Sequence, residues 1–203
     1  MEHSAKEKPA LLIIDMVKDN LDLEHPYPIT PFALQIVPQI NNLIAFFREQ
    51  GWPIVFSTDA FNEDDFIFKG RMKPHSLAGT PGAEIADMLD YRPEKDIWLP
   101  KPRFSAFFCT GLEKRLRELG VTLCALAGIS TNFCVLSTAM DALCHDFKVV
   151  LLEDCTAASS ESVHRQTLDI YRRNALYPLF RVAGSQDLQE MLMSEKRTKG
   201  QGA

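Results

Sequence analysis

The sequence lacks the features that would indicate secretion, nucleic-acid binding or membrane insertion. Its five cysteines form no CxxC pair, and no secretory leader is recognisable ahead of them, so we expect reduced thiols in a cytoplasmic protein. The longest apolar runs fall far short of the roughly 20 residues that a membrane span needs. The formal net charge is only −5, and no basic stripe suits nucleic acid or an anionic membrane. We therefore expect a small-molecule substrate as the partner.

The composition is that of an ordinary globular chain. Its 203 residues are 46% hydrophobic and 24% charged, which is enough to bury a substantial core. No internal stretch has the composition of a linker, so we predict a single domain over residues 9–193. The polar ends, residues 1–8 and 194–203, are predicted to be flexible.

Short apolar or β-branched runs alternate with stretches of helical spacing. The predicted strands are Ala10–Ile14, Pro53–Thr58, Asp96–Leu99, Val121–Ala127, Lys148–Leu152 and Leu179–Val182. The predicted helices are Leu34–Gln50, Leu112–Leu119, Phe133–His145, Ser162–Asn174 and Gln186–Met193. This alternation indicates a three-layer α/β/α domain of Rossmann type around a mostly parallel, six-stranded sheet. Ligands of such sheets bind outside the carboxyl ends of the strands.

Three chemically reactive residues follow different predicted strands. Asp15 comes directly after the first strand, Lys101 follows the third, and Cys134 lies where the fourth turns into a helix. Each has an ordinary structural explanation: a turn aspartate, a solvated lysine and a buried structural cysteine. Together, however, they place an acid, an amine and a thiol on one sheet edge. This combination favours nucleophilic catalysis by Cys134, with Asp15 as the proton acceptor.

The position of Cys134 has two predicted consequences. A thiol at a helix N-terminus lies near unpaired backbone N–H groups and the positive end of the helix dipole, which favours a lowered pKa. The same turn offers backbone N–H groups that can stabilise an oxyanion. The other four cysteines are predicted to be small core residues; they are Cys109, Cys124, Cys144 and Cys155.

Three motifs, in this order, resemble the isochorismatase-like hydrolase superfamily. They are LLIID ending at Asp15, KPRFSAF beginning at Lys101, and GISTNFCVLSTAMDA around Cys134. The resemblance covers roughly residues 9–193. The superfamily includes nicotinamidases, N-carbamoylsarcosine amidases, ureidoacrylate amidases and isochorismatases.

The resemblance implies a role for each motif residue. Asp15 would be the general acid and base, Lys101 the third member of a triad, and Cys134 the nucleophile that forms a thioester. The peptide bond Ile129–Ser130 would be cis, and the amides of Ser130 and Cys134 would form the oxyanion hole. Members are commonly homodimers or homotetramers, which implies the same assembly here.

Two departures from the superfamily narrow the expected chemistry. Metal-binding members of the nicotinamidase type carry Asp-x-His after the second strand, whereas this chain has Asp59-Ala-Phe61 and keeps only His75 further on. Two protein ligands make a poor site for zinc or iron, so we predict no metal and no other cofactor. Isochorismatases commonly have glycine at the cysteine position. The incomplete metal site therefore disfavours a nicotinamidase, and Cys134 favours amide-type chemistry over that of isochorismatase proper.

Four residues are predicted to line the substrate pocket. Phe61 and Phe133 would form aromatic walls, and Arg71 and His75 come from a long loop after the second strand. Surface solvation of Arg71, and a loop-ordering role for His75, remain open. Three other functions also remain open: a vinyl-ether hydrolase, a non-catalytic binding protein and a thiol redox sensor.

Overall fold

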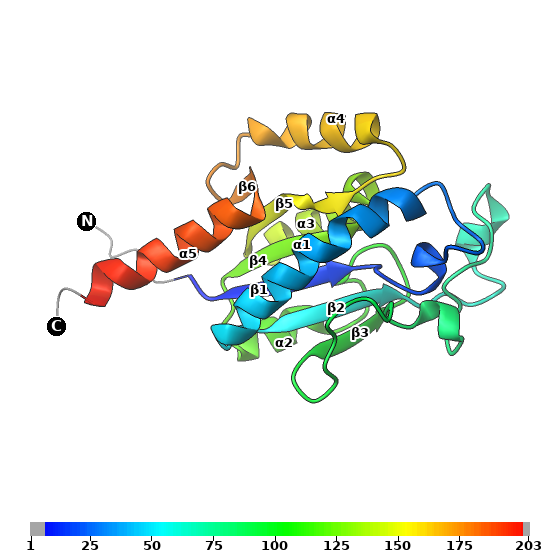
Figure 1. Ribbon diagram of the computed structural model, residues 1–203, viewed down its shortest axis with the longest axis horizontal. Coiled ribbons are helices and arrows are strands. Elements are labelled where there is room, and N and C mark those ends of the chain that lie inside the picture. Colours follow the sequence, from blue (N-terminus) through cyan, green and yellow to red (C-terminus); the bar gives the residue numbers. More distant parts are fainter. Residues whose placement is uncertain (1–6, 201–203) are drawn as a thin grey trace.

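A computed structural model describes residues 7–200 and contains the six predicted strands in a single sheet. The strands are β1 (Pro9–Ile14), β2 (Ile54–Asp59), β3 (Ile97–Lys101), β4 (Leu123–Ile129), β5 (Lys148–Ala157) and β6 (Phe180–Ala183). Their order is β3-β2-β1-β4-β5-β6, and every neighbouring pair is parallel. The predicted six-stranded α/β architecture is confirmed (Figure 1).

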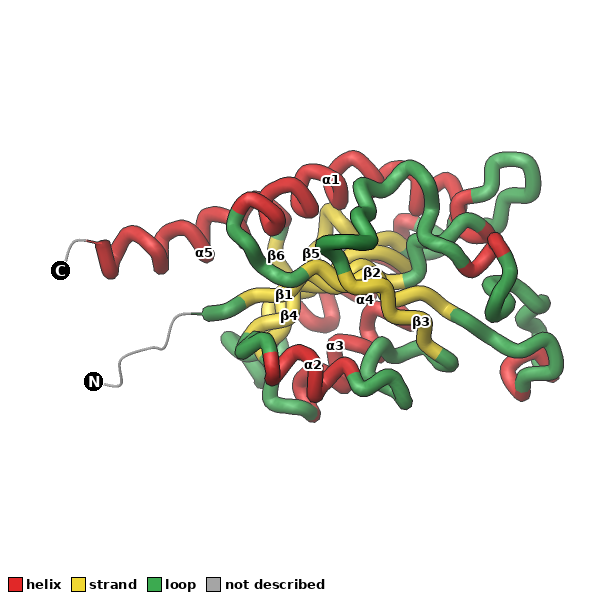
Figure 2. The backbone as a smooth tube through the Cα atoms, turned by 90° about the horizontal axis from the view of Figure 1, so that it is seen from below, coloured by secondary structure: helices red, strands yellow, loops and turns green. Residues whose placement is uncertain are grey.

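Helices cover both faces of this sheet. Helix α1 (Thr30–Glu49) and α5 (Ser185–Gly200) lie on one face, whereas α2 (Leu112–Glu118) and α3 (Leu136–Cys144) lie on the other (Figure 2). Helix α4 (Glu161–Arg172) packs near β6 and adds Leu168 to the second side of the core. The three layers predicted from the alternation of elements are therefore present.

Strand β1 shows why two core layers form. Leu11 and Ile13 pack in the cluster that α1 and α5 complete, while Leu12 and Ile14 pack in the cluster beneath α2 and α3. All six β1 residues are buried. A strand that buries both of its faces needs the continuous apolar run seen in the sequence.

The largest differences from the predicted elements lie at helix ends. Helix α1 begins at Thr30, ahead of the apolar face, because Pro31 fits the first helical turn, where its missing N–H costs nothing. Helix α5 continues past Met193, where the predicted helix ends, to Gly200. No proline or glycine interrupts the sequence between these points.

Glu7 and Lys8, just ahead of β1, contact the rest of the domain. The Lys8 carbonyl accepts from the Thr122 backbone N–H, and the Lys8 backbone N–H donates to the Thr122 hydroxyl. Glu7 forms an ion pair with Lys148. The remaining parts of the predicted flexible ends, residues 1–6 and 201–203, lie outside the described residues. Within residues 7–200 no helix is long and apolar enough to cross a membrane.

The strand order changes direction between β1 and β4. From β1 the chain builds outward through β2 and β3 on one side and through β4, β5 and β6 on the other. Such a switch point leaves a crevice at the carboxyl ends of the central strands, where ligands of open α/β sheets bind. Figure 1 shows the long segment after β2 gathered at this same end of the sheet.

Candidate active site

Four side chains from four adjacent strands meet in this crevice. Asp15 follows β1, Asp59 ends β2, Lys101 ends β3, and Cys134 follows β4. A carboxylate oxygen of Asp15, one of Asp59 and the Cys134 sulfur all lie within 4.8 Å of one another. The structure thus brings together the predicted residues Asp15, Lys101 and Cys134. It adds Asp59, which the sequence suggested only as a remnant metal ligand.

Lys101 is the cation at the centre of this group. Its side chain is fully buried, and Nζ donates to Asp15 Oδ2 over 2.9 Å and to Asp59 Oδ1. Burial alone would lower the pKa of Lys101, but the negative charges of Asp15, Cys134 and Asp59 outweigh burial and raise it. Lys101 therefore stays protonated and holds both carboxylates beside the thiol.

The backbone around Asp15 positions its carboxylate. Asp15 has a positive φ of 53°, its carbonyl accepts from Asn20 Nδ2 at 3.0 Å, and its Oδ1 accepts from the backbone N–H of Asp59 at 2.8 Å. Both carboxylate oxygens are thus engaged, one by a neutral donor and one by Lys101. A carboxylate fixed in this way is held in one rotamer close to Cys134.

A glycine lets the Cys134 turn approach Asp15 closely. Gly128 pairs with Ile14 across β1 and β4 and has a φ of +102°. A Cβ at Gly128 would lie 2.0 Å from the Ile14 carbonyl oxygen. Only glycine therefore permits both this backbone conformation and this approach.

Cys134 lies in a tight turn that joins β4 to α3. The turn, Thr131–Val135, is a single π-helical turn, and the Ile129–Ser130 peptide bond before it is cis. The Ser130 carbonyl accepts from the N–H groups of Phe133 and Val135. The Thr138 hydroxyl donates to the Cys134 carbonyl at 2.8 Å and accepts from Ala106. These bonds fix the nucleophile turn against α3 and the loop after β3.

The predicted lowering of the Cys134 pKa is wrong. Burial and the adjacent Asp15 carboxylate raise the pKa of the Cys134 thiol well above its ordinary value, although Lys101 acts in the opposite sense. The side chain is only slightly exposed, so desolvation of a thiolate outweighs the helix dipole. At neutral pH the resting group is the thiol, within 4.8 Å of an Asp15 carboxylate oxygen.

The prediction that the other cysteines are core residues is half correct. Cys124 and Cys155 are buried, and burial raises the pKa of Cys124 to about 12. Cys109 and Cys144 are exposed, so the prediction is wrong for them. Cys144 ends α3 on the outer side of the helix, and Cys109 has a positive φ of 55° in a surface turn. An apolar sequence neighbourhood did not determine burial at these two positions.

A hydrogen-bond link that no sequence pattern indicated joins α4 to the nucleophile turn. Thr131 is buried and is the first residue of that turn. Its hydroxyl oxygen lies 2.9 Å from His164 Nδ1. His164 Nε2 lies 3.1 Å from the Glu153 carbonyl oxygen, which can only accept. Nε2 therefore carries the proton, and Nδ1 of the neutral ring accepts from Thr131.

This link predicts a pH-dependent contribution to stability. Burial lowers the pKa of His164, and the positive charge of Arg172 lowers it too. The hydrogen bond to the Glu153 carbonyl and the negative charges of Glu161 and Glu153 act in the opposite direction but are outweighed. The folded state therefore favours neutral His164. The stability that this preference contributes is lost as pH falls below the pKa of histidine in the unfolded chain, about 6.5. In thermal melts, the difference in Tm between wild type and His164→Asn should be largest above about pH 7 and shrink toward about pH 5. A difference that stays constant over this range would refute the assignment.

A pocket opens above the four clustered residues. Its volume is about 680 Å³, and Asp15, Asp59 and Cys134 contribute to its lining, whereas Lys101 lies beneath it. All four residues predicted for the pocket line it; they are Phe61, Arg71, His75 and Phe133. Residues that the sequence had not singled out for the pocket also line it, among them Asn20, Tyr27 and Asn132.

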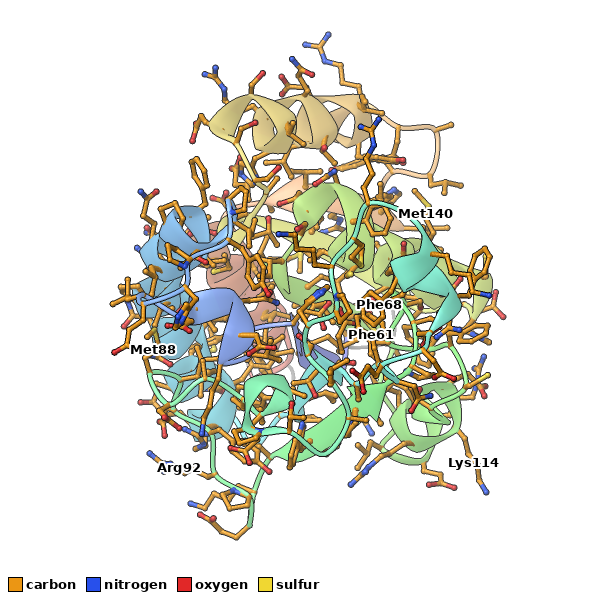
Figure 3. The ribbon with its side chains drawn as sticks, turned by 90° about the vertical axis from the view of Figure 1, so that its right-hand side faces the viewer. Phe61, Phe68, Met88, Arg92, Lys114 and Met140 are labelled. Atoms are coloured by element: carbon orange, nitrogen blue, oxygen red, sulfur yellow. The ribbon has the colours of Figure 1, made fainter. Side chains whose placement is uncertain are left out.

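Aromatic rings form two walls of this pocket. On one side His75 packs against Tyr27, Phe61 and Phe68, with ring centroids 5.8, 5.7 and 6.0 Å away. On the other, Phe104 meets Phe133 edge to face at 4.7 Å. Figure 3 shows Phe61 and Phe68 together at the crevice end of the molecule, in accordance with their centroid distance of 5.7 Å.

Asp59 lacks the histidine partners of a nicotinamidase-type metal site. It clusters instead with Asp15 and Cys134, three potential donors whose ligand atoms lie within 4.8 Å of one another. Asp59 is ion-paired with Lys101. His75 has its Nδ1 2.9 Å from the Lys73 carbonyl oxygen and its ring among aromatics. Phe61, at the position of a ligand histidine in metal-binding members, is buried and offers no donor. The ammonium of Lys101 supplies the positive charge between the carboxylates.

Comparisons with known proteins agree with the fold and with the motifs. The family model described as Isochorismatase domain matches residues 9–179. A probable inactive nicotinamidase from Arabidopsis thaliana is 33% identical over 165 residues, which cover 76% of this chain and 83% of that protein. A maleamate amidohydrolase from Pseudomonas putida is 28% identical over 168 residues, which cover 79% and 78%. The crystal structure of an N-carbamoylsarcosine amidase from Thermoplasma acidophilum superposes with a TM-score of 0.74 at 32% identity, covering 88% of this chain and 96% of that one.

Proposed function

Because the chain belongs to the isochorismatase-like hydrolase superfamily, we propose that it is a cysteine hydrolase of a small amide, carbamoyl or ureido compound. The bond cleaved is a non-peptide C–N bond, and the intermediate is a thioester. Asp15, Lys101 and Cys134 form the catalytic triad, and the amides of Ser130 and Cys134 form the oxyanion hole.

One observation carries this proposal: a buried thiol lies within 4.8 Å of a carboxylate oxygen of Asp15, and a buried ammonium contacts the same carboxylate. Nucleophilic catalysis requires a nucleophile next to its base, and the base in turn held by a third group. Asp15 is the base and Lys101 is the third group. A single structural cysteine in a core needs neither partner.

The chemistry follows from the protonation states. Sγ of Cys134 attacks the carbonyl carbon while Asp15 takes the thiol proton, and the carbonyl electrons move to oxygen, where the Ser130 and Cys134 amides stabilise them. Collapse breaks the C–N bond, and Asp15 returns the proton to the leaving amine. Water then attacks the thioester as Asp15 accepts its proton, and the proton passes to Cys134 as the acid leaves. Each oxyanion donor typically contributes about 3 to 4 kcal/mol at the transition state.

The raised pKa of Cys134 agrees with this sequence of proton transfers. A free thiolate is scarce in the resting site, so the thiol must lose its proton to Asp15 as it attacks. The positive charge of Lys101 stabilises the sulfur as it becomes negative. A redox sensor needs an exposed thiol with a lowered pKa, and Cys134 has neither property.

Ammonia release from a compound panel tests the proposal. The panel contains a dicarboxylic acid monoamide, a carbamoyl amino acid, a ureido acid and nicotinamide. We expect turnover of at least one of the first three, and trapping of an acyl-enzyme on Cys134 detectable by intact mass. Activity should survive removal of metals with a chelator, and elemental analysis of untreated protein should find less than stoichiometric zinc and iron. Ammonia release without acylation of Cys134, or activity lost to the chelator and regained with zinc, would contradict the mechanism.

A further inference from the structure

Two threonine hydroxyls fix the two ends of the nucleophile turn. At one end, the Thr138 hydroxyl of α3 donates to the Cys134 carbonyl at 2.8 Å. At the other end, the Thr131 hydroxyl lies 2.9 Å from Nδ1 of His164 on α4. Both threonine side chains are buried, so each hydroxyl needs a partner within the protein. Ser130, which supplies one amide of the proposed oxyanion hole, immediately precedes the second of these contacts.

His164 is itself fixed by both β5 and α4. Its Nε2 lies 3.1 Å from the Glu153 carbonyl oxygen in β5. Its backbone N–H donates to the Ser160 carbonyl at 3.0 Å, and the Ser160 hydroxyl caps α4 by accepting from the Val163 N–H. The remaining polar atom of the ring is Nδ1, which faces Thr131. A ring held in this way places the Thr131 hydroxyl relative to β5 and α4.

The stretch between the two oxyanion amides depends on this contact. Three residues separate Ser130 from Cys134. Two of them, Asn132 and Phe133, are exposed and line the pocket. The third, Thr131, is fully buried, and its hydroxyl attaches the stretch to the body of the domain. Oxyanion donors must lie within about 2.7 to 3.1 Å of the developing charge, so a small displacement of this stretch removes one of them.

Helix α4 lies outside the pocket but contacts the nucleophile turn. None of its described residues lines the pocket, and Figure 1 shows α4 at the top of the view, beyond β5. Its buried residues are Thr167 and Leu168. The Thr167 hydroxyl donates to the Val163 carbonyl of the same helix at 2.8 Å, whereas the His164 ring reaches Thr131. Thr167 is therefore a matched residue of α4 whose hydroxyl bonds within the helix.

We propose that His164, acting through Thr131, is a positioning residue that keeps the amides of Ser130 and Cys134 around the oxyanion. This inference rests on the proposed function and assigns part of its oxyanion hole to a helix outside the pocket. The bond makes no contact with the substrate, and the oxyanion exists only as the reaction proceeds. Loss of the bond should therefore lower kcat and leave KM nearly unchanged.

Removing either partner of the bond tests the proposal. In His164→Leu and in Thr131→Val, kcat for ammonia release should fall about tenfold or more, and KM should stay within about threefold of the wild type. The double variant should lose little more than either single variant, because both substitutions remove the same bond. Thr131→Val keeps the size of the side chain and provides the test if His164→Leu does not fold.

Three control variants accompany these. His164→Asn keeps an acceptor and Thr131→Ser keeps a hydroxyl, so both should retain most of the wild-type kcat. Thr167→Val removes the buried hydroxyl of α4 that bonds within the helix, and it should retain the wild-type kcat.

Two chemical probes of Cys134 test the same point without turnover. With butanal, Sγ bonds reversibly to the aldehyde carbon, Asp15 takes the thiol proton, and the carbonyl electrons move to an oxygen in the hole. Iodoacetamide alkylates the same sulfur as iodide leaves and Asp15 takes the proton, and no oxyanion forms. Mass spectrometry of the Cys134 peptide, with and without butanal, gives the alkylation rate and the Kd of the aldehyde. In His164→Leu and Thr131→Val this Kd should rise about tenfold or more, and the alkylation rate should stay within about threefold.

These measurements separate positioning from a general loss of structure. If alkylation slows as much as butanal binding weakens, or if Thr167→Val loses as much activity, the bond only supports the fold and the proposal is overturned. Unchanged kcat and unchanged butanal Kd in both His164→Leu and Thr131→Val would also overturn it, and would leave the hydrolase proposal intact. Weakened butanal binding with unchanged alkylation supports the positioning role even when no amide of the panel is hydrolysed.

Discussion

Replacing Cys134 with alanine is expected to reduce kcat for ammonia release by roughly 10⁴-fold or more, because the only atom that can form the thioester is removed. The substitution deletes one buried atom, so the cost in the free energy of unfolding should be about 1 kcal/mol. Ammonia release and urea unfolding of the same preparation measure both effects. The acyl-enzyme seen by intact mass should disappear.

Cys144→Ala is the matched control for this prediction. Cys144 ends the helix that follows the nucleophile turn, but its side chain is exposed. This variant should keep the activity and the acyl-enzyme of the wild type. If Cys134→Ala retains more than a small fraction of wild-type kcat, Cys134 is not the nucleophile, and the vinyl-ether or binding functions become the better explanations.

The fold was predictable because its signals are local. A continuous apolar run such as Leu11–Ile14 indicates a strand that is buried on both faces. The helical spacing of apolar residues before Gly51 indicates a helix that is buried along one side. The placement of Asp15, Lys101 and Cys134 at one edge followed from parallel topology alone. Each lies at or just past the end of a strand, and the strands run in the same direction.

The electrostatics of the site were less predictable, because they depend on contacts between distant segments. The helix position of Cys134 favoured a lowered pKa, but its depth in the crevice and the contact with Asp15 determine the opposite direction. His164 comes from α4, and no local pattern links it to Thr131. The motif around Asp59 directed attention to metal binding, whereas the structure makes Asp59 a partner of Lys101.

Replacing Lys101 with methionine is expected to destabilise the protein by about 3 to 5 kcal/mol, the typical cost of removing one partner of a buried ion pair. Asp15 and Asp59 are both buried, and each now has Lys101 as its ion-pair partner. Without the ammonium, Asp59 must either repel the Asp15 carboxylate in a medium of low dielectric or hold a proton at neutral pH, and both cost stability. Urea unfolding at about pH 7 should show a lowered midpoint, and turnover should be lost because nothing stabilises the negative sulfur.

The same variant should respond to acid in the direction opposite to an ordinary ion pair. Burial and the charge of Asp15 already raise the pKa of Asp59 in the wild type, with Lys101 acting against them. That pKa is about 8 in the wild type, and removing Lys101 raises it further, so a proton taken up as the pH falls through the higher value relieves the repulsion. A group with a raised folded pKa favours the folded state at low pH and loses that effect as pH rises through the folded pKa. The stability deficit of Lys101→Met should therefore be larger at about pH 9 than at about pH 7, because the folded pKa of Asp59 is about 8 in the wild type and higher in the variant.

A second substitution distinguishes charge repulsion from lost packing. Asp59→Asn in the Lys101→Met background removes one carboxylate while keeping the size of the side chain, and it should restore part of the lost stability at neutral pH. It should not restore turnover, because Cys134 still lacks a nearby cation. Lys148→Met provides a control for loss of a more exposed pair, with Glu7, and should cost no more than about 1 kcal/mol. If Asp59→Asn lowers stability further in the Lys101→Met protein, the buried charges do not dominate the effect. The role of Lys101 would then be the packing of its aliphatic stem, and its ammonium would not be what holds the two carboxylates beside Cys134.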